Sequence, residues 1–142
     1  MTFRALALMT ALTVGGGVHL WHVHQRAAID RELLASADSN GFVSVVMPPD
    51  VPRDTAVILA PLNCPSVRAK KADAMAKELG QMGITVRRSN SYSARITDPA
   101  QMPLLTRTNA VLGGEVPIVI INGMAKANPT VEEVALEFRR DK

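Results

Sequence analysis

The sequence contains a single cysteine, Cys64, among its 142 residues. One cysteine excludes an internal disulfide and a multi-cysteine zinc site, so any disulfide that forms must involve a second molecule. Aromatic residues make up only 4% of the chain, which leaves few side chains on which nucleic-acid bases could stack. The net charge is +3, but the basic residues are scattered rather than gathered in one block. We therefore expect no nucleic-acid partner.

Histidine is also scarce, and all three histidines, His19, His22 and His24, lie near the amino terminus. A hydrolase would therefore lack a histidine base close to Cys64 or to a serine. Closely spaced imidazoles can bind a transition metal, but no carboxylate or cysteine lies near them in the sequence, which favours a polar collar at a membrane surface. The glycine run 15–17 lies in an apolar segment and does not indicate a phosphate-binding loop. We expect no metal and no cofactor.

The amino-terminal segment has the pattern of a signal peptide or a membrane anchor. Arg4 is followed by an apolar run at 5–23, whose length is close to the roughly 20 residues that span a bilayer as a helix. No convincing small-residue cleavage site follows, so a single-pass anchor is favoured, although a cleaved signal stays open. We expect an anchor or signal at 1–25, a linker helix at 26–39 and a domain at 40–142, which would lie in the periplasm or elsewhere outside the cytoplasm.

The stretch around Cys64 has the pattern of a strand, a short loop and a helix. The apolar run 56–60 predicts a buried strand, and the periodicity of 65–82 predicts an amphipathic helix. Pro65 suits the first helical position, because its missing N–H would be unpaired there. A thiol at a helix start faces unpaired backbone donors, which stabilise the thiolate. The pattern therefore favours a reactive cysteine over a buried apolar one, which is the common role of a lone cysteine. The apolar side of the helix is predicted to consist of Val67, Ala72, Met75, Ala76 and Leu79.

The rest of the chain continues the alternation of strands and helices. Strands are predicted at 42–47, 84–86, 116–121 and 124–127. Helices are predicted between Asp98–Pro99, as cap and first residue, and Gly113–Gly114, and at 131–140, where Asn128-Pro129-Thr130 forms the cap. The strand, helix and strand from 56 to 86 should form a right-handed unit with parallel strands. Asn122–Gly123 is a strong hairpin signal, so the last two strands should be antiparallel. From residue 56 onward the predicted order is βαβαββα.

From Thr55 to Arg140 this arrangement resembles the thioredoxin superfamily, particularly its glutaredoxin-like members. The resemblance depends on Cys64-Pro65 at a helix start, on the second βα pair, and on Val116-Pro117 at the opening of a strand that turns back as a hairpin. It implies a thioredoxin-like α/β fold with a central mixed sheet flanked by helices. This domain would follow the transmembrane or signal helix that the amino-terminal segment predicts. The resemblance also implies that Cys64 is the nucleophile and that Val116 pairs with an extended substrate. Pro65 would contact the same substrate, and Pro117 would follow a cis peptide bond.

The motif reads Cys64-Pro65-Ser66-Val67, so valine replaces the second cysteine of a dithiol site. Without a resolving thiol, any mixed disulfide forms with a partner protein or with glutathione. The lysine that glutaredoxins place before the cysteine is missing, and residues 126–130 replace their Gly-Gly-x-Asp glutathione contact, which weakens the case for glutathione. We therefore expect a membrane-anchored thiol protein that acts on protein thiols or disulfides. The alternative is a redox-inactive thioredoxin-fold module for binding or assembly in the cell envelope.

Overall fold

The computed structural model describes residues 24, 28, 31 and 33–140 of the chain. Contacts divide the chain into two units, Met1–Ala35 and Ser36–Lys142. Every described residue of the first unit is helical. The predicted anchor at 5–23 lies outside the described residues, as do His19 and His22. Within the part of the chain that the structure describes, no helix is both long enough and apolar enough to cross a membrane.

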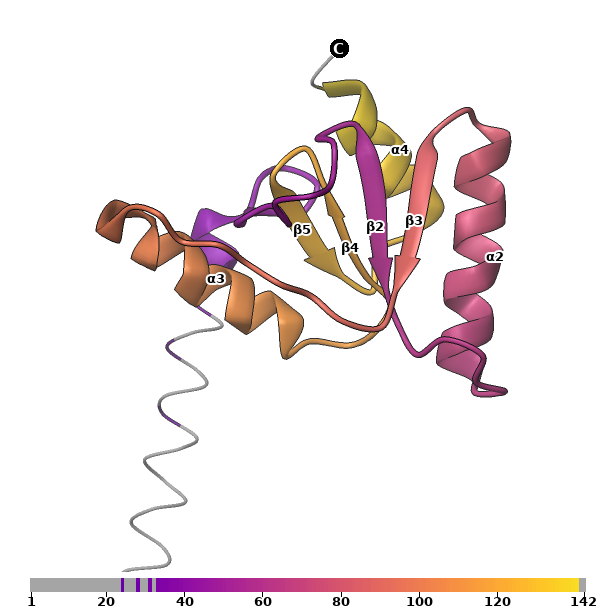
Figure 1. Cartoon of the computed structure of the whole chain (residues 1–142), viewed down its shortest axis with the longest axis horizontal. Coiled ribbons are helices and arrows are strands. Elements are labelled where there is room, and N and C mark those ends of the chain that lie inside the picture. The colour runs from indigo at the N-terminus through magenta and orange to yellow at the C-terminus, as the bar shows by residue number, and fades with distance from the viewer. Residues whose placement is uncertain (1–23, 25–27, 29–30, 32, 141–142) are drawn as a thin grey trace, which may run out of the picture. The chain divides into compact units, whose positions relative to one another are not determined.

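The second unit is an α/β domain built on a five-stranded mixed sheet (Figure 1). In chain order its elements are β1 (Val43–Ser44), β2 (Thr55–Leu59), α2 (Val67–Gln81), β3 (Thr85–Ser89), η1 (Pro99–Gln101), α3 (Met102–Leu112), β4 (Ile118–Ile121), β5 (Met124–Ala127) and α4 (Val131–Arg140). The strands lie in the order β1-β5-β4-β2-β3. Only β2 and β3 are parallel neighbours, and the other neighbouring pairs are antiparallel. The predicted order of strands and helices from residue 56 is therefore confirmed.

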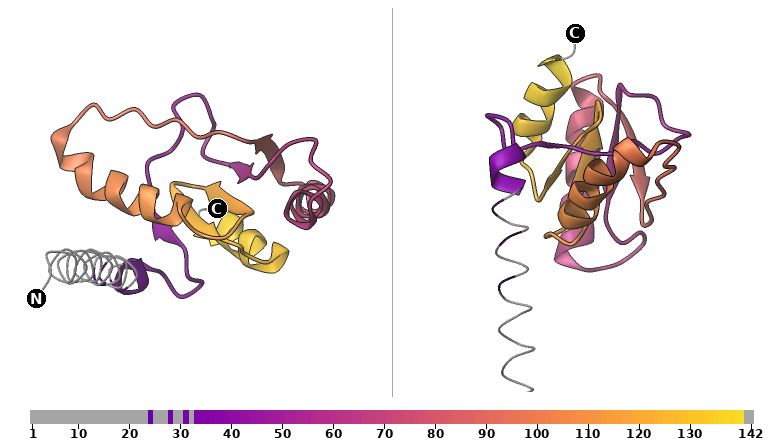
Figure 2. Two further views of the ribbon diagram at one scale, coloured as in Figure 1. Left: turned by 90° about the horizontal axis from the view of Figure 1, so that it is seen from below. Right: turned by 90° about the vertical axis from the view of Figure 1, so that its left-hand side faces the viewer.

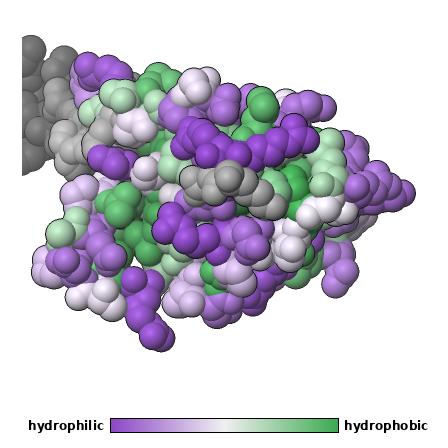
Figure 3. Space-filling model, turned by 90° about the horizontal axis from the view of Figure 1, so that it is seen from above, coloured by the Kyte–Doolittle hydropathy of each residue, from purple (hydrophilic) through white to green (hydrophobic). Residues whose placement is uncertain are grey.

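Helices cover both faces of the sheet. α2 and α4 pack together on one face, and α3 lies on the other face against β1 and β5 (Figure 2). The main apolar core lies between the sheet and the α2–α4 layer, where Ile58 and Val119 of the strands meet Met75, Leu79 and Val134 of the helices. Seen from the end at which β2 begins, hydrophilic side chains predominate and hydrophobic ones form scattered patches (Figure 3).

Helix α2 begins later than the sequence pattern predicts. Ser66 is its N-cap, and the Ser66 hydroxyl accepts a hydrogen bond from the backbone N–H of Ala69. Pro65 therefore precedes the N-cap, and its predicted place as first helical residue is wrong. Val67 was predicted on the buried side, but it is 84% exposed. It lies about 200° around the helix from Ala69, because each residue turns the helix by about 100°. The residues that are buried are Ala69, Ala72, Met75 and Leu79.

The amino-terminal strand is shorter than predicted. The pattern at 42–47 predicts a full strand, but β1 pairs with β5 only at Val43–Ser44. Beyond β1, the Val45 N–H bonds the carbonyl oxygen of Gly123 at 2.8 Å, and the Val46 N–H bonds Thr108 Oγ1 at 3.1 Å. The side chains of Val45 and Val46 stay buried. An apolar run therefore predicts that the side chains are buried, but it does not predict that the backbone pairs with a neighbouring strand along the whole segment.

Local turn and cap signals are confirmed at three places. Asn122 and Gly123 have positive φ values of 55° and 79°, as the predicted hairpin between β4 and β5 requires. Thr130 and Glu133 form a reciprocal capping box at the start of α4. The Asp98 side chain accepts the Ala100 N–H at 2.8 Å and opens the short helix η1, which leads into α3.

Candidate functional site

Cys64 lies in the loop that joins the end of β2 to the start of α2 (Figure 1). We call residues 60–66 the thiol loop. The cysteine is free and partly exposed, and it stands two residues before the N-cap Ser66. A reagent can therefore reach the thiol, which distinguishes Cys64 from a fully buried core cysteine.

The environment of Cys64 favours its ionised form. Hydrogen bonding from the Ser66 hydroxyl, and to a smaller extent from the Ser66 backbone N–H, lowers the pKa of Cys64 below its usual value. The Ser66 hydroxyl oxygen also accepts the Ala69 N–H at 3.3 Å, and this leaves its own proton free for the thiolate. The role of Ser66 at the thiol was missed from the sequence, although a serine directly before a helical run is a recognisable N-cap signal.

The Val116–Pro117 segment lies at the same end of the sheet as the thiol loop. β2 and β4 are antiparallel, and Leu59 at the end of β2 is paired with Ile118 at the start of β4. The residues that follow Leu59 and those that precede Ile118 therefore leave the sheet at one edge. The Val116–Pro117 peptide bond is cis, as predicted. Pro117 is fully buried, and Val116 is partly exposed.

Asn128, which directly follows β5, connects this segment to helix α2. Its backbone N–H bonds the carbonyl oxygen of Pro117 at 2.8 Å, and its side-chain amide donates to Glu115 Oε2 at 3.0 Å. The Asn128 amide oxygen accepts a hydrogen bond from Lys71 of α2. The sequence pattern assigned Asn128 only to the cap region of the last helix. Its positive φ of 50°, a conformation that asparagine tolerates, fits the sharp turn that these contacts need.

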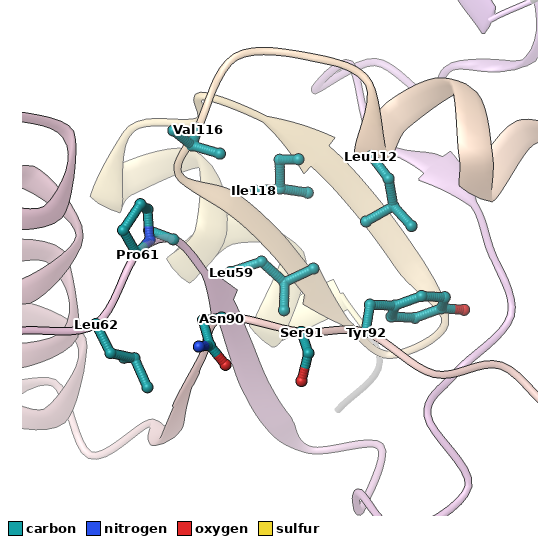
Figure 4. Close-up of a pocket in the computed structure, with 10 residues that line it drawn as sticks. Leu59, Pro61, Leu62, Asn90, Ser91, Tyr92, Leu112, Val116 and Ile118 are labelled. Atoms are coloured by element: carbon teal, nitrogen blue, oxygen red, sulfur yellow. The ribbon is translucent and has the colours of Figure 1, made fainter.

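A hollow of about 450 Å³ lies between the thiol loop and the Val116–Pro117 segment. This volume is in the range of ligand-binding clefts. Figure 4 shows Leu59 and Ile118 in the middle of the hollow, with Val116 at one end and Tyr92 at the other. The walls are mostly apolar, and they consist of Leu59, Ala60, Pro61, Leu62, Asn90, Ser91, Tyr92, Leu112, Val116 and Ile118.

Exposed apolar side chains flank the thiol on both sides along the chain. Leu62 is 42% exposed and Val67 is 84% exposed. Val67 also occupies the place at which a dithiol motif would have its second cysteine, so no second thiol stands beside Cys64. The four predicted site residues thus lie at one end of the sheet, with Cys64 and Pro65 in the thiol loop and Val116 and Pro117 directly before β4. Of these four residues only Val116 lines the hollow.

In the described part of the chain no candidate metal site accompanies the thiol. Among the described residues, no group of three or more histidine, cysteine, aspartate or glutamate side chains is placed to hold an ion. His24, the one described histidine, is exposed. Comparisons with family models, with curated proteins and with solved structures found no match to this chain.

Proposed function

We propose that this chain is a thioredoxin-like thiol protein in which Cys64 forms mixed disulfides with partner proteins. The observation that carries the proposal is the place of Cys64, partly exposed and just before the N-cap of α2, where donors from Ser66 lower its pKa. A lower pKa increases the thiolate fraction at neutral pH, and the thiolate is the nucleophile in disulfide exchange.

The topology supports a thioredoxin-like fold. Strands β3, β2, β4 and β5 are neighbours in that order, β2 and β3 are parallel, and the other two pairs are antiparallel. Helix α2 follows β2 directly, and α4 follows the β4–β5 hairpin. This is the βαβαββα arrangement that the resemblance implies, and β1 adds a short strand beyond β5.

The proposed reaction conserves the number of disulfides. The Cys64 thiolate attacks one sulfur of a partner disulfide, forms a new bond to that sulfur and releases the other sulfur as a thiolate. A thiol of a second molecule then attacks the mixed disulfide, forms a disulfide with the partner and returns Cys64 as a thiolate. The external thiol is required because the chain has no other cysteine.

A protein partner fits the site better than glutathione. The segment at 126–130 holds Asn128 in contacts with the chain itself, and the Thr130 N–H is already bonded to Glu133 at 2.9 Å. Glu132 and Glu133 both lie in the first turn of α4. Glu133 is paired with Lys126, but Glu132 is exposed, and its like charge disfavours the carboxylates of glutathione.

The experiment that tests the function is disulfide trapping in intact cells. Wild-type chain should give disulfide-linked adducts on non-reducing gels, and Cys64→Ser should give none, because the mixed disulfide needs the thiolate. Mass spectrometry would identify the adducts. Absence of any Cys64 adduct from the wild-type chain would contradict the proposal.

The second candidate function is a thioredoxin-fold module that binds partners without redox chemistry. The exposed Val67 in place of a second cysteine favours it, because an apolar side chain that is 84% exposed suits contact with another protein. On the non-reducing gels such a module would give no adduct. In affinity capture under native conditions it would recover the same partners with wild-type chain and with Cys64→Ser, and reducing agent would not release them.

We also propose that residues 5–23 tether the domain to a membrane and place it in the periplasm or elsewhere outside the cytoplasm. The support is the apolar run after Arg4 in the sequence.

A further inference from the structure

Arg88 of β3 connects the thiol loop to two other elements. Its guanidinium Nε and Nη2 contact Asp73 Oδ1 of α2 at 3.0 Å and 2.9 Å. Nη1 donates to the carbonyl oxygen of Ile58 in β2 at 3.3 Å, and Nη2 reaches the carbonyl oxygen of Pro61 at 3.5 Å. The side chain is only 16% exposed. One planar cation thus satisfies acceptors from a helix, a strand and a loop, which the fork geometry of arginine permits.

The contact with Pro61 matters because the loop has few other restraints. Among the hydrogen bonds between described residues, it is the one that reaches residues 61–65 from another element. Ala60, directly before them, is held by the carbonyl oxygen of Ser89 at 3.0 Å, and Ser66, directly after them, is held by α2. Pro61 and Leu62 also form one wall of the hollow.

We propose that Arg88 is a positioning residue for Cys64. Arg88 holds the thiol loop against α2 and beside the hollow, so that the Cys64 sulfur can attack a partner disulfide along the line of its S–S bond. The inference rests on the proposed function of Cys64. Asp73 orients the guanidinium of Arg88. Arg88 holds the Pro61 carbonyl group, and the short backbone segment from Pro61 to Cys64 then restrains the position of the sulfur. Arg88 itself does not touch the reacting atoms.

The test compares variants in two reactions. The first is exchange with a short peptide whose cysteine carries 2-nitro-5-thiobenzoate as a mixed disulfide. The absorbance of the released 2-nitro-5-thiobenzoate measures the rate of exchange. The second is alkylation of Cys64 by iodoacetamide across a range of pH. Arg88→Met should lower the exchange rate by roughly tenfold, because small displacements of reacting groups cost up to about 100-fold in rate. It should also move the alkylation profile toward higher pH, because the loop then holds the sulfur less firmly against Ser66. A purely structural role would lower stability and leave that profile in place.

The matched control is the neighbouring arginine. Arg87 pairs with Asp50 at 3.1 Å and has a side chain that is 53% exposed, so Arg87→Met should exchange like wild type. Arg88→Lys should be intermediate, because an ammonium group cannot bond all three acceptors in one plane. If Arg88→Met does not fold, Asp73→Asn serves instead, because the Asp73 side chain is 66% exposed and its replacement should leave the fold intact while loosening Arg88.

The outcomes separate this inference from the proposed function. Wild-type chain that exchanges no faster than the same chain unfolded in urea would contradict the function of Cys64 itself. The positioning role alone would be overturned if wild type exchanges fast and folded Arg88→Met exchanges equally fast with an unchanged alkylation profile. The same result in both Arg88→Lys and Asp73→Asn would also overturn it.

Discussion

Ser66 caps helix α2 and also stabilises the thiolate of Cys64. Its hydroxyl oxygen caps α2 through the Ala69 N–H, while its hydroxyl proton and backbone N–H favour the Cys64 thiolate. Ser66 serves both roles because its hydroxyl oxygen accepts from Ala69, which leaves the hydroxyl hydrogen available to the sulfur two residues earlier. A serine here therefore links the stability of α2 to the reactivity of the thiol.

Substitutions at Ser66 should separate the two effects. Ser66→Ala should lower the free energy of unfolding by about 1 kcal/mol, because the cap is lost. It should also raise the pKa of Cys64, because only the backbone N–H still donates. Ser66→Asp should restore the cap and raise the pKa further, because a like charge opposes the thiolate.

Iodoacetamide alkylation against pH measures the pKa in each variant, with the urea-unfolded chain as the reference, and urea titration measures stability. If wild-type Cys64 and the unfolded chain were alkylated with the same pH profile, Ser66 would have no influence on the thiol.

At the scale of elements, the carboxylate of Glu133 stabilises the start of helix α4. Glu133 accepts the Thr130 N–H at 2.9 Å and pairs with Lys126 of β5 at 2.8 Å. These two partners, Lys126 first, lower the pKa of Glu133 below its usual value. The pair also joins α4 to the hairpin that carries Asn128, and so α4 supports the segment beside the thiol loop.

The lowered pKa of Glu133 predicts an acid dependence of stability. A carboxyl group whose pKa is lower in the folded than in the unfolded chain stabilises the fold fully above the unfolded pKa of about 4.3, and this contribution is lost as the pH falls through the folded pKa. Glu133→Gln keeps an acceptor for Thr130 but cannot titrate. At pH 7 it should be less stable than wild type by at most about 1 kcal/mol.

The difference between wild type and Glu133→Gln should shrink as the pH falls below about 4. Urea unfolding at several pH values measures it, and Glu132→Gln, an exposed neighbour in the same turn, is the matched control. A difference that stayed constant from pH 7 to acid would show that Glu133 acts without its charge.

At the scale of the whole molecule, the chain consists of an amino-terminal unit and a domain that starts at Ser36. The proposed tether belongs to the first unit. Full-length chain should therefore remain in the membrane fraction after an alkaline wash, because an apolar segment of about 20 residues inserts too strongly to be extracted with peripheral proteins. Release of the intact chain into the wash would contradict the tether.

The mixed α/β order could be predicted because its signals are local. Helical periodicity at α2, the Asn122–Gly123 turn and the Thr130 cap each lie within a few neighbouring residues, and interactions over such distances are visible in the sequence. The predicted burial of Val67 was wrong because Val67 lies about 200° around the helix from the buried Ala69. The start of the helix was also assigned too early, at Pro65. Helix ends are set by single capping contacts, which a periodic pattern does not contain.

The sequence by itself determined the thiol, the helix that follows it and the absence of a second cysteine, because these depend on residue type and on neighbours along the chain. Only the tertiary structure decided what surrounds Cys64. The pairing of Leu59 with Ile118 brings Val116 to the thiol loop, and the parallel pairing of β2 with β3 brings Arg88 within reach of Pro61. Such contacts join residues far apart in the chain, and strand register, which the whole core sets, creates them.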